Sequence, residues 1–225
     1  MIRLHDVKKT FFVKGQYIDV IKGITAVIPS KTSIGLLGRN GAGKSTLMNI
    51  IAGTMEPTSG AVRSTGTISW PVGFAGSFHP ELTGSQNTRF VARVYGVDTD
   101  ELVEFARDFS QLGDKFDQPF RTYSSGMRSR LAFGVSMGID FDTYLVDEVT
   151  SVGDAAFKAK SEAIFHDRLK NRGAIMVSHS TGMLRRLCTC GIVLEDGYAT
   201  YFDTIEEAID THERNLEVIE LDPHE

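Results

Sequence analysis

The sequence is poor in cysteine, contains no long hydrophobic run and has no excess of positive charge. Two cysteines among 225 residues, Cys188 and Cys190, are too few for a disulfide framework, which is typical of proteins kept in a reducing cytoplasm. A C-x-C pair without a second pair is a weak indication of zinc, so no metal site is assigned to it.

The missing hydrophobic runs and the charge exclude further classes of protein. No stretch approaches the ~18 to 20 apolar residues of a membrane-spanning helix, and the start, MIRLHDVKKTF, has no apolar core of a signal peptide. If the protein works at a membrane, a partner has to supply the membrane part. The formal net charge of −5 argues against a general nucleic-acid-binding surface.

The order of the expected elements indicates an α/β fold that is interrupted by a helical insertion. Short apolar or β-branched runs are typical of strands, and apolar residues three or four positions apart are typical of helices. The expected strands cover 2–7, 17–28, 33–37, 143–147 and 174–178, with a strand and a turn within 66–74 and a hairpin at 191–202. The expected helices cover 45–53, 85–96, 98–113, a stretch between the last two strands, and the tail from Thr204.

The segment GRNGAGKS fits G-x-x-x-x-G-K-[ST] and lies between an expected buried strand and an expected helix. Its glycines let backbone N–H groups surround phosphate oxygens, and the positive end of the helix faces the same anion. Lys44 adds a charge for the β- and γ-phosphates, and the Ser45 hydroxyl can bind Mg²⁺. The segment therefore predicts a nucleoside triphosphate site. The candidate binding residues are Gly38, Arg39, Asn40, Gly41, Ala42, Gly43, Lys44, Ser45 and Thr46.

Two later strands end in residues that suit such a site. The run TYLVDE ends in Asp147, which can hold Mg²⁺, and Glu148, which can act as general base toward the attacking water. His179 follows the run AIMVS and can donate a hydrogen bond to the γ-phosphate or hold that water. In isolation, an acidic strand cap and a surface histidine would explain the same residues. The catalytic candidates are Glu148, His179 and Lys44, and the metal candidates are Ser45 and Asp147.

The segment RTYSSGMRSRLAFGVSM places Ser124, Ser125 and Gly126 at the start of an expected helix, where the backbone can bind an anion. In this order, the motifs resemble the ATP-binding subunits of ABC transporters over about residues 2–203. The resemblance implies ATP and Mg²⁺ as cofactors, and two copies packed head to tail. It also implies that these three residues contact nucleotide held by the partner copy. The implied fold class is an α/β P-loop NTPase core of ABC type, with an antiparallel β subdomain and a helical subdomain insertion.

Two other motifs of the family are changed or missing. Residues 147–154, DEVTSVGD, resemble the family's D-E-P-T-S-x-L-D with Val149 in place of proline, so 151–154 resemble the loop that crosses the dimer interface. The glutamine that the family usually places soon after the GTISW strand is absent. Gln86 comes too late and is assigned to a helix, so water or another side chain has to replace the usual metal contact.

An aromatic side chain of the family stacks on adenine, and three residues near the N-terminus could supply it. Phe11 is the first candidate, Phe12 and Tyr17 are alternatives, and any of the three can instead belong to the core.

The segments GFAGSFHPELTG, YSSGMRSRLAFGVSM and DEVTSVGDAAFK resemble the ATPases of polysaccharide exporters, especially capsule exporters of Gram-negative bacteria. Related O-antigen exporter ATPases often carry a long C-terminal carbohydrate-binding domain. A sequence that ends soon after a short acidic tail favours the capsule branch. The alternatives are an O-antigen or teichoic-acid exporter ATPase or, in another class, a soluble ABC-type ATPase of DNA repair or translation.

The resemblance implies a homodimeric ATPase that powers export of lipid-linked capsular polysaccharide through a separate integral membrane permease subunit. It would act at the cytoplasmic face of the bacterial inner membrane, with no nucleic acid and no direct glycan binding. One ATP-binding domain is expected over 1–225, with a helical subdomain at about 77–140 and an acidic helical tail at 204–225. The segment FAGSFHPELTG either lines a groove for a partner helix or belongs to the core of the small lobe. A solvated face is favoured for the tail.

Overall fold

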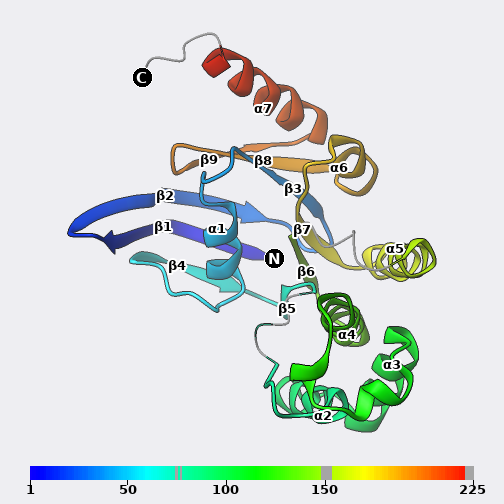
Figure 1. The fold of residues 1–225 in the computed structure, drawn as a ribbon. Coiled ribbons are helices and arrows are strands. Elements are labelled where there is room, and N and C mark those ends of the chain that lie inside the picture. The colour runs from blue at the N-terminus through cyan, green and yellow to red at the C-terminus, as the bar shows by residue number, and fades with distance from the viewer. Residues whose placement is uncertain (74–75, 77, 148–153, 221–225) are drawn as a thin grey trace. The chain divides into compact units, whose positions relative to one another are not determined.

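The fold is taken from a computed structural model that describes residues 1–73, 76, 78–147 and 154–220, without the side chains at 155 and 218–220. The described residues form two compact units. The first contains 1–71, 141–147 and 171–220, and the second contains 72–140 and 154–170. Figure 1 shows all the strands in the first unit, whereas the second is built of helices. No helix in these described ranges has the length and apolar character needed to cross a membrane.

The first unit contains two sheets. An antiparallel sheet in the order β2-β1-β4 is made of β1 (Ile2–Val13), β2 (Gln16–Ile28) and β4 (Ser59–Ser64). The other sheet has the order β5-β6-β7-β3-β8-β9, and only β9 runs antiparallel to its neighbour. Its strands are β3 (Ser33–Leu37), β5 (Ile68–Pro71), β6 (Thr143–Asp147), β7 (Gly173–Val177), β8 (Cys190–Glu195) and β9 (Tyr198–Phe202).

One buried core joins both sheets of the first unit to α1 (Lys44–Ile51). The run SIGLL of β3 is buried from its second residue onward, as expected for a parallel strand that is covered on both faces. Leu47 and Met48 of α1 are buried in the same core. The start of α1, which directly follows the glycine-rich loop, is therefore held firmly by its own apolar side chains.

Helix α7 (Ile205–Glu220) packs closely on the six-stranded sheet, because two strand positions under it lack a side chain. A Cβ at Gly191 would collide with the Cβ of Ala208, and a Cβ at Gly35 would lie 2.6 Å from Ile205 Cδ1. Ile205, Ala208 and Ile209 are buried in this contact. The shorter α6 (Thr181–Leu187) also contacts α7.

The second unit consists of α2 (Gly84–Tyr95), α3 (Thr99–Ser110), α4 (Ser125–Gly138) and α5 (Ala155–Leu169), with short 3₁₀ turns at Gly113–Asp117 and Phe120–Thr122. The ring of Phe109 packs on Phe133 and Phe157, with centroids 5.6 and 5.4 Å apart. Thr83 and Asp98 cap α2 and α3 with side-chain oxygens that accept backbone N–H bonds.

Most of the expected elements are present, with shifted ends. Strand β1 continues to Val13 instead of ending near residue 7, because it pairs with β2 up to the hairpin turn. The strand and the turn expected within 66–74 are both present, since β5 ends at Pro71 and a turn follows at 72–73. The expected hairpin turn is confirmed at Asp196-Gly197, where both φ angles are positive, 48° and 81°. The domain bounds at 77–140 and 204–225 stay predictions.

Phe78 decides between the two alternatives for its own position in FAGSFHPELTG. Phe78 is buried, and its ring meets that of Phe120 edge-on at 5.3 Å. This side chain therefore belongs to the core of the second unit. Residues 74, 75 and 77 of the segment lie outside the described residues.

Both thiols are buried, and burial raises the pKa of Cys188 to about 12, with a smaller contribution from Cys190. At pH 8 the reactive thiolate of Cys188 should be roughly a thousand-fold scarcer than that of an ordinary cysteine. We therefore expect native protein to release thionitrobenzoate from dithionitrobenzoate at least a hundred-fold more slowly than protein in urea. Fast release by folded protein would contradict this burial.

Candidate functional site

The glycine-rich loop joins β3 to α1, as its sequence predicts. Gly43 is the N-cap of α1, with φ 99° and no side-chain capping bond. A Cβ at Gly43 would lie 2.8 Å from Val20 Cγ1, so both conformation and space favour glycine there. No side chain caps the helix, and its first residues line an open cavity, so its first N–H groups are available to bind an anion.

Lys44 and Ser45 extend this loop toward Asp147. Lys44 Nζ donates to the carbonyl oxygens of Gly38 and Arg39, at 2.6 and 2.9 Å. Ser45 Oγ donates to Asp147 Oδ2 at 3.4 Å, although the two residues lie 102 positions apart. A hydroxyl and a carboxylate placed together are the oxygen ligands that Mg²⁺ prefers, so the residues present fit this ion.

Most of the loop candidates share one cavity of about 350 Å³, here called the P-loop cavity. It forms because β6, β7 and β3 are neighbours whose carboxyl ends meet at one edge of the sheet. Val20 and Val177 line it, although the sequence did not single them out. Its complete lining is Val20, Asn40, Gly41, Gly43, Lys44, Ser45, Thr46, Asp147 and Val177.

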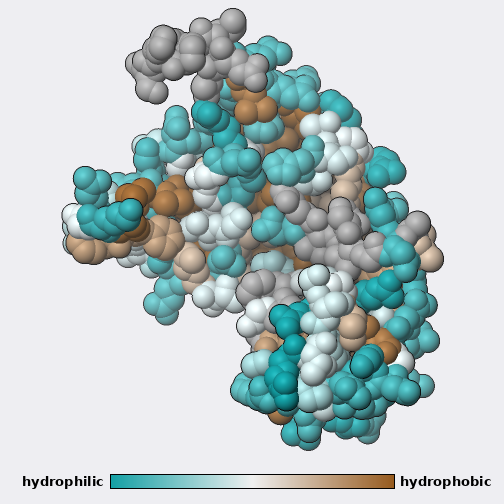
Figure 2. All heavy atoms as spheres, viewed as in Figure 1, coloured by the Kyte–Doolittle hydropathy of each residue, from teal (hydrophilic) through white to brown (hydrophobic). Residues whose placement is uncertain are grey.

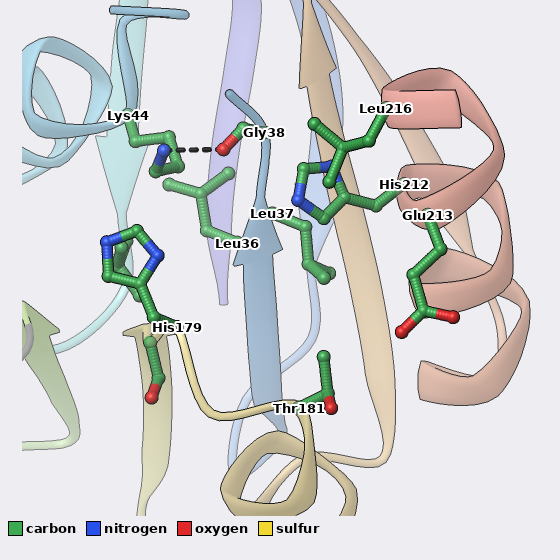
Figure 3. Close-up of a pocket in the computed structure, with 11 residues that line it drawn as sticks. Leu36, Leu37, Gly38, Lys44, His179, Thr181, His212, Glu213 and Leu216 are labelled. Atoms are coloured by element: carbon green, nitrogen blue, oxygen red, sulfur yellow. Dashed lines mark hydrogen bonds between the residues drawn. The ribbon is translucent and has the colours of Figure 1, made fainter. Parts of the chain in front are cut away.

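A second cavity of about 210 Å³, here called the α7 cavity, brings His179 and Lys44 together. Figure 3 shows these two side chains facing it from one side, while His212 and Leu216 project into it from α7 on the other. Burial and then the charge of Lys44 lower the pKa of His212, opposed by Glu195 and Glu213 and reinforced by His179. No pattern in the sequence predicted that α7 would line this cavity.

The aromatic candidates lie along the β1–β2 hairpin. Phe12 and Tyr17 are 65% and 80% exposed, with ring centroids 5.0 Å apart, so neither belongs to the core. Figure 2 shows hydrophobic surface at the tip of this hairpin. Phe11 is half-buried below the Lys9 ammonium and pairs with Ile18, which lines a cavity of about 340 Å³. The loop residues of that cavity are Arg39, Asn40, Gly41 and Ala42. Which ring stacks on adenine stays a prediction.

The Ser-Ser-Gly candidates begin α4 in the second unit. Ser124 is its N-cap, and Ser124 Oγ accepts a hydrogen bond from Met127 N at 3.3 Å. A Cβ at Gly126 would meet no atom within 4 Å, so open space surrounds this helix start. Ser125 is the first helical residue. Contact of these residues with nucleotide on a partner copy stays a prediction.

Two further expectations concern Glu148 and Gln86. Glu148, the candidate general base, lies outside the described residues. The assignment of Gln86 to a helix is confirmed. Its Oε1 accepts a hydrogen bond from Thr83 N at 2.9 Å and completes the capping box of α2.

The comparisons with known proteins identify the family of the chain. The family model described as ABC transporter matches residues 21–151. The polysialic acid transport ATP-binding protein KpsT of Escherichia coli is 45% identical, over 94% of this chain and 96% of that protein. The capsule polysaccharide export ATP-binding protein CtrD of Neisseria meningitidis is 41% identical, over 92% and 96%. An O-antigen export system ATP-binding protein RfbB of Klebsiella pneumoniae is more distant, at 34% identity over 93% and 87%.

Solved structures confirm the predicted fold class. The ATP-binding cassette MJ0796, as a dimer in a post-hydrolysis state with ADP and Pi, superposes with a TM-score of 0.76. The match covers 91% of this chain and 99% of that one at 19% identity, so it shows the fold alone. Together with the family match over the P-loop, these findings place the chain in the ABC transporter family, as an ATP-hydrolysing subunit of the group that contains KpsT and CtrD.

Proposed function

We propose that the chain is the ATPase subunit of a transporter that exports a lipid-linked capsular polysaccharide through a separate membrane permease. The observation that carries the ATPase part is the P-loop cavity, where Lys44, Ser45 and Asp147 lie together. The polysaccharide part is supported by identity of 41 to 45% to capsule and polysialic acid transport proteins along almost the whole chain. The working place would be the cytoplasmic face of the bacterial inner membrane.

The proposed chemistry assigns each residue one task. The loop N–H groups and Lys44 hold the β- and γ-phosphates, and Ser45 and Asp147 hold Mg²⁺. When bound, Mg²⁺ neutralises phosphate charge. Glu148 accepts the proton of the attacking water, and His179 orients that water or the γ-phosphate. An aromatic ring of the β1–β2 hairpin, Phe11 first, stacks on adenine.

Two copies complete the proposed cycle. Ser124, Ser125 and Gly126 of one copy cover the ATP that the other copy holds, so ATP joins the two subunits. Hydrolysis converts the bridging ATP into ADP and phosphate. These two anions repel each other, and the dimer then opens. The helical part of the chain, expected at about 77–140, passes the motion to the permease, and the ATPase itself binds no glycan and no nucleic acid.

Gly126→Asp tests the contact between copies. Since a Cβ at Gly126 meets open space, the new side chain fits without strain in its own chain. A carboxylate facing phosphate costs several kcal/mol, which should weaken the ATP-dependent dimer about a hundred-fold or more. Analytical ultracentrifugation with ATP and Mg²⁺ measures the dimer, and capsule export by cells that carry the variant should be lost.

Gly126→Ala is the matched control, because it adds a Cβ without charge. It should keep both the dimer and export, and initial ATP binding should be normal in both variants. Wild-type dimerisation and export by Gly126→Asp would rule out the proposed contact.

The transport function is tested by gentle solubilisation of native membranes and capture of this subunit. A multi-span membrane protein and a lipid-linked acidic glycan should purify with it. Recovery of soluble partners or nucleic acid alone would contradict export but leave ATP hydrolysis intact.

A further inference from the structure

The α7 cavity connects the C-terminal helix to the nucleotide site, and all its walls belong to the first unit. Lys44 lines both this cavity and the P-loop cavity, and so does Val177. Figure 3 shows that His212 points from α7 into the space that Lys44 and His179 face. A change at α7 can therefore reach the phosphate-binding end of the site through a single cavity.

His212 brings an incompletely bonded polar group into this space. Its Nδ1 is buried and has no hydrogen-bond partner among the described residues, and the same holds for Glu195 Oε2 at the end of β8. Buried polar atoms in folded proteins are nearly always paired with protein groups or with ordered water. A cavity of about 210 Å³ has room for such water between His212 and the opposite wall.

The close packing of α7 on the sheet fixes the position of His212 relative to the glycine-rich loop. The contacts of Ala208 with Gly191 and of Ile205 with Gly35 lie one to two helical turns before His212. Gly35 is part of β3, the strand that continues into the P-loop. The helix that carries His212 and the strand that carries the loop are thus packed together with little room for adjustment.

We propose that His212 is a positioning residue of the ATPase site, and that α7 is a wall that keeps Lys44 and His179 in place for the phosphate end of ATP. This inference rests on the proposed ATPase function. His212 does not touch the reacting atoms, and it acts through the α7 cavity. Burial and Lys44 keep its pKa low, so that the neutral ring adds no positive charge beside Lys44 and His179 near pH 7. Glu195 and Glu213, the facing carboxylates, act in the opposite direction.

Three substitutions of His212 separate a polar role from a space-filling one. His212→Ala and His212→Leu should lower kcat for ATP hydrolysis about ten- to hundred-fold, because small displacements of catalytic groups cost that much. His212→Asn should restore most of the rate, since its amide places a polar atom near the position of Nδ1. ADP lacks the γ-phosphate but keeps the β-phosphate that Lys44 is proposed to hold, so its dissociation constant should rise by less than about five-fold in all three variants, a smaller change than that of kcat. Phosphate release and calorimetric ADP titration of the full-length chain measure these quantities.

Two further variants test the helix itself. Glu217→Gln removes a charge from an exposed position of α7 that does not line the cavity, and it should hydrolyse ATP like wild type. Gly191→Ala adds one methyl group below Ala208, and by shifting α7 it should lower kcat without changing any cavity side chain.

Each alternative outcome has its own meaning. Wild-type kcat in His212→Leu together with a slow His212→Asn would assign a space-filling role and overturn the inference. Equal losses of kcat and of ADP-binding capacity would assign a purely structural role and overturn it as well. A wild-type chain that hydrolyses no ATP would overturn the proposed function, and this inference with it.

Discussion

Replacement of Lys44 by alanine is expected to lower the rate of ATP hydrolysis by about 10²- to 10³-fold, the usual effect of removing one charged donor from a reacting centre. Lys44 is the single cationic side chain among the described residues that line the P-loop cavity. Its ammonium donates to Gly38 O and Arg39 O, and it can turn from these carbonyls to the phosphates. Phosphate release over a range of ATP concentrations gives kcat and KM for the variant.

Lys158→Ala is the control for the charge change, because Lys158 is an exposed lysine of α5. It should hydrolyse ATP at the wild-type rate. Lys44→Arg should not restore activity, since a planar guanidinium cannot take the place of the compact ammonium in so close a loop. Normal turnover by Lys44→Ala would place the phosphate site elsewhere in the chain.

The variant Glu148→Gln is expected to bind ATP but to hydrolyse it about 10²- to 10⁴-fold more slowly, the range that loss of a general base produces. The phosphate contacts and the metal ligands remain, so ATP should persist between two subunits. The variant should then elute as a stable dimer from a size-exclusion column run with ATP and Mg²⁺. Phosphate release under the same conditions measures the residual rate.

Glu162→Gln makes the same chemical change at an exposed position of α5. It should remain active, and it should show no lasting dimer once the ATP has been consumed. A monomeric Glu148→Gln variant that hydrolyses ATP normally would transfer the base role to another residue.

The sequence predicted the placement of the glycine-rich loop and of Asp147 well, because its signals are local. The loop from Gly38 to Ser45 is specified by its glycines, and the short apolar runs before it and before Asp147 can hardly be anything but buried strands. Strands of a parallel sheet end at a common edge, so the approach of Ser45 and Asp147 followed from a loop that leaves the end of β3 and a carboxylate that ends β6.

The contribution of α7 could not be predicted, because it depends on contacts between distant segments. The tail shows only an acidic, amphipathic pattern, and His212 has no neighbour in sequence that marks it as special. The position of His212 results from the missing side chains at Gly35 and Gly191, which allow α7 to pack closely on the sheet. Single glycines in strands have many causes, so neither pointed to the tail.

The sequence could not distinguish the aromatic candidates for a different reason. Phe11 and Phe12 are adjacent in a strand, so they project to opposite faces, and a shift of register by one residue would exchange their roles. The register pairs Phe12 with Tyr17 and leaves both exposed, whereas Phe11 is half-buried opposite Ile18. Only the register of strand pairing distinguishes the exposed rings from the half-buried one, and no sequence pattern predicts that register.

The burial of both cysteines makes the natural chain a convenient background for spectroscopic probes. A single cysteine introduced at an exposed position, such as Glu217 on α7 or Tyr17 on the hairpin, would carry a spin label or a fluorophore almost exclusively. No native thiol would have to be removed, so the packing around Cys188 and Cys190 would stay intact. Distances between two such labels in the assembled transporter could then be followed while ATP is bound and consumed.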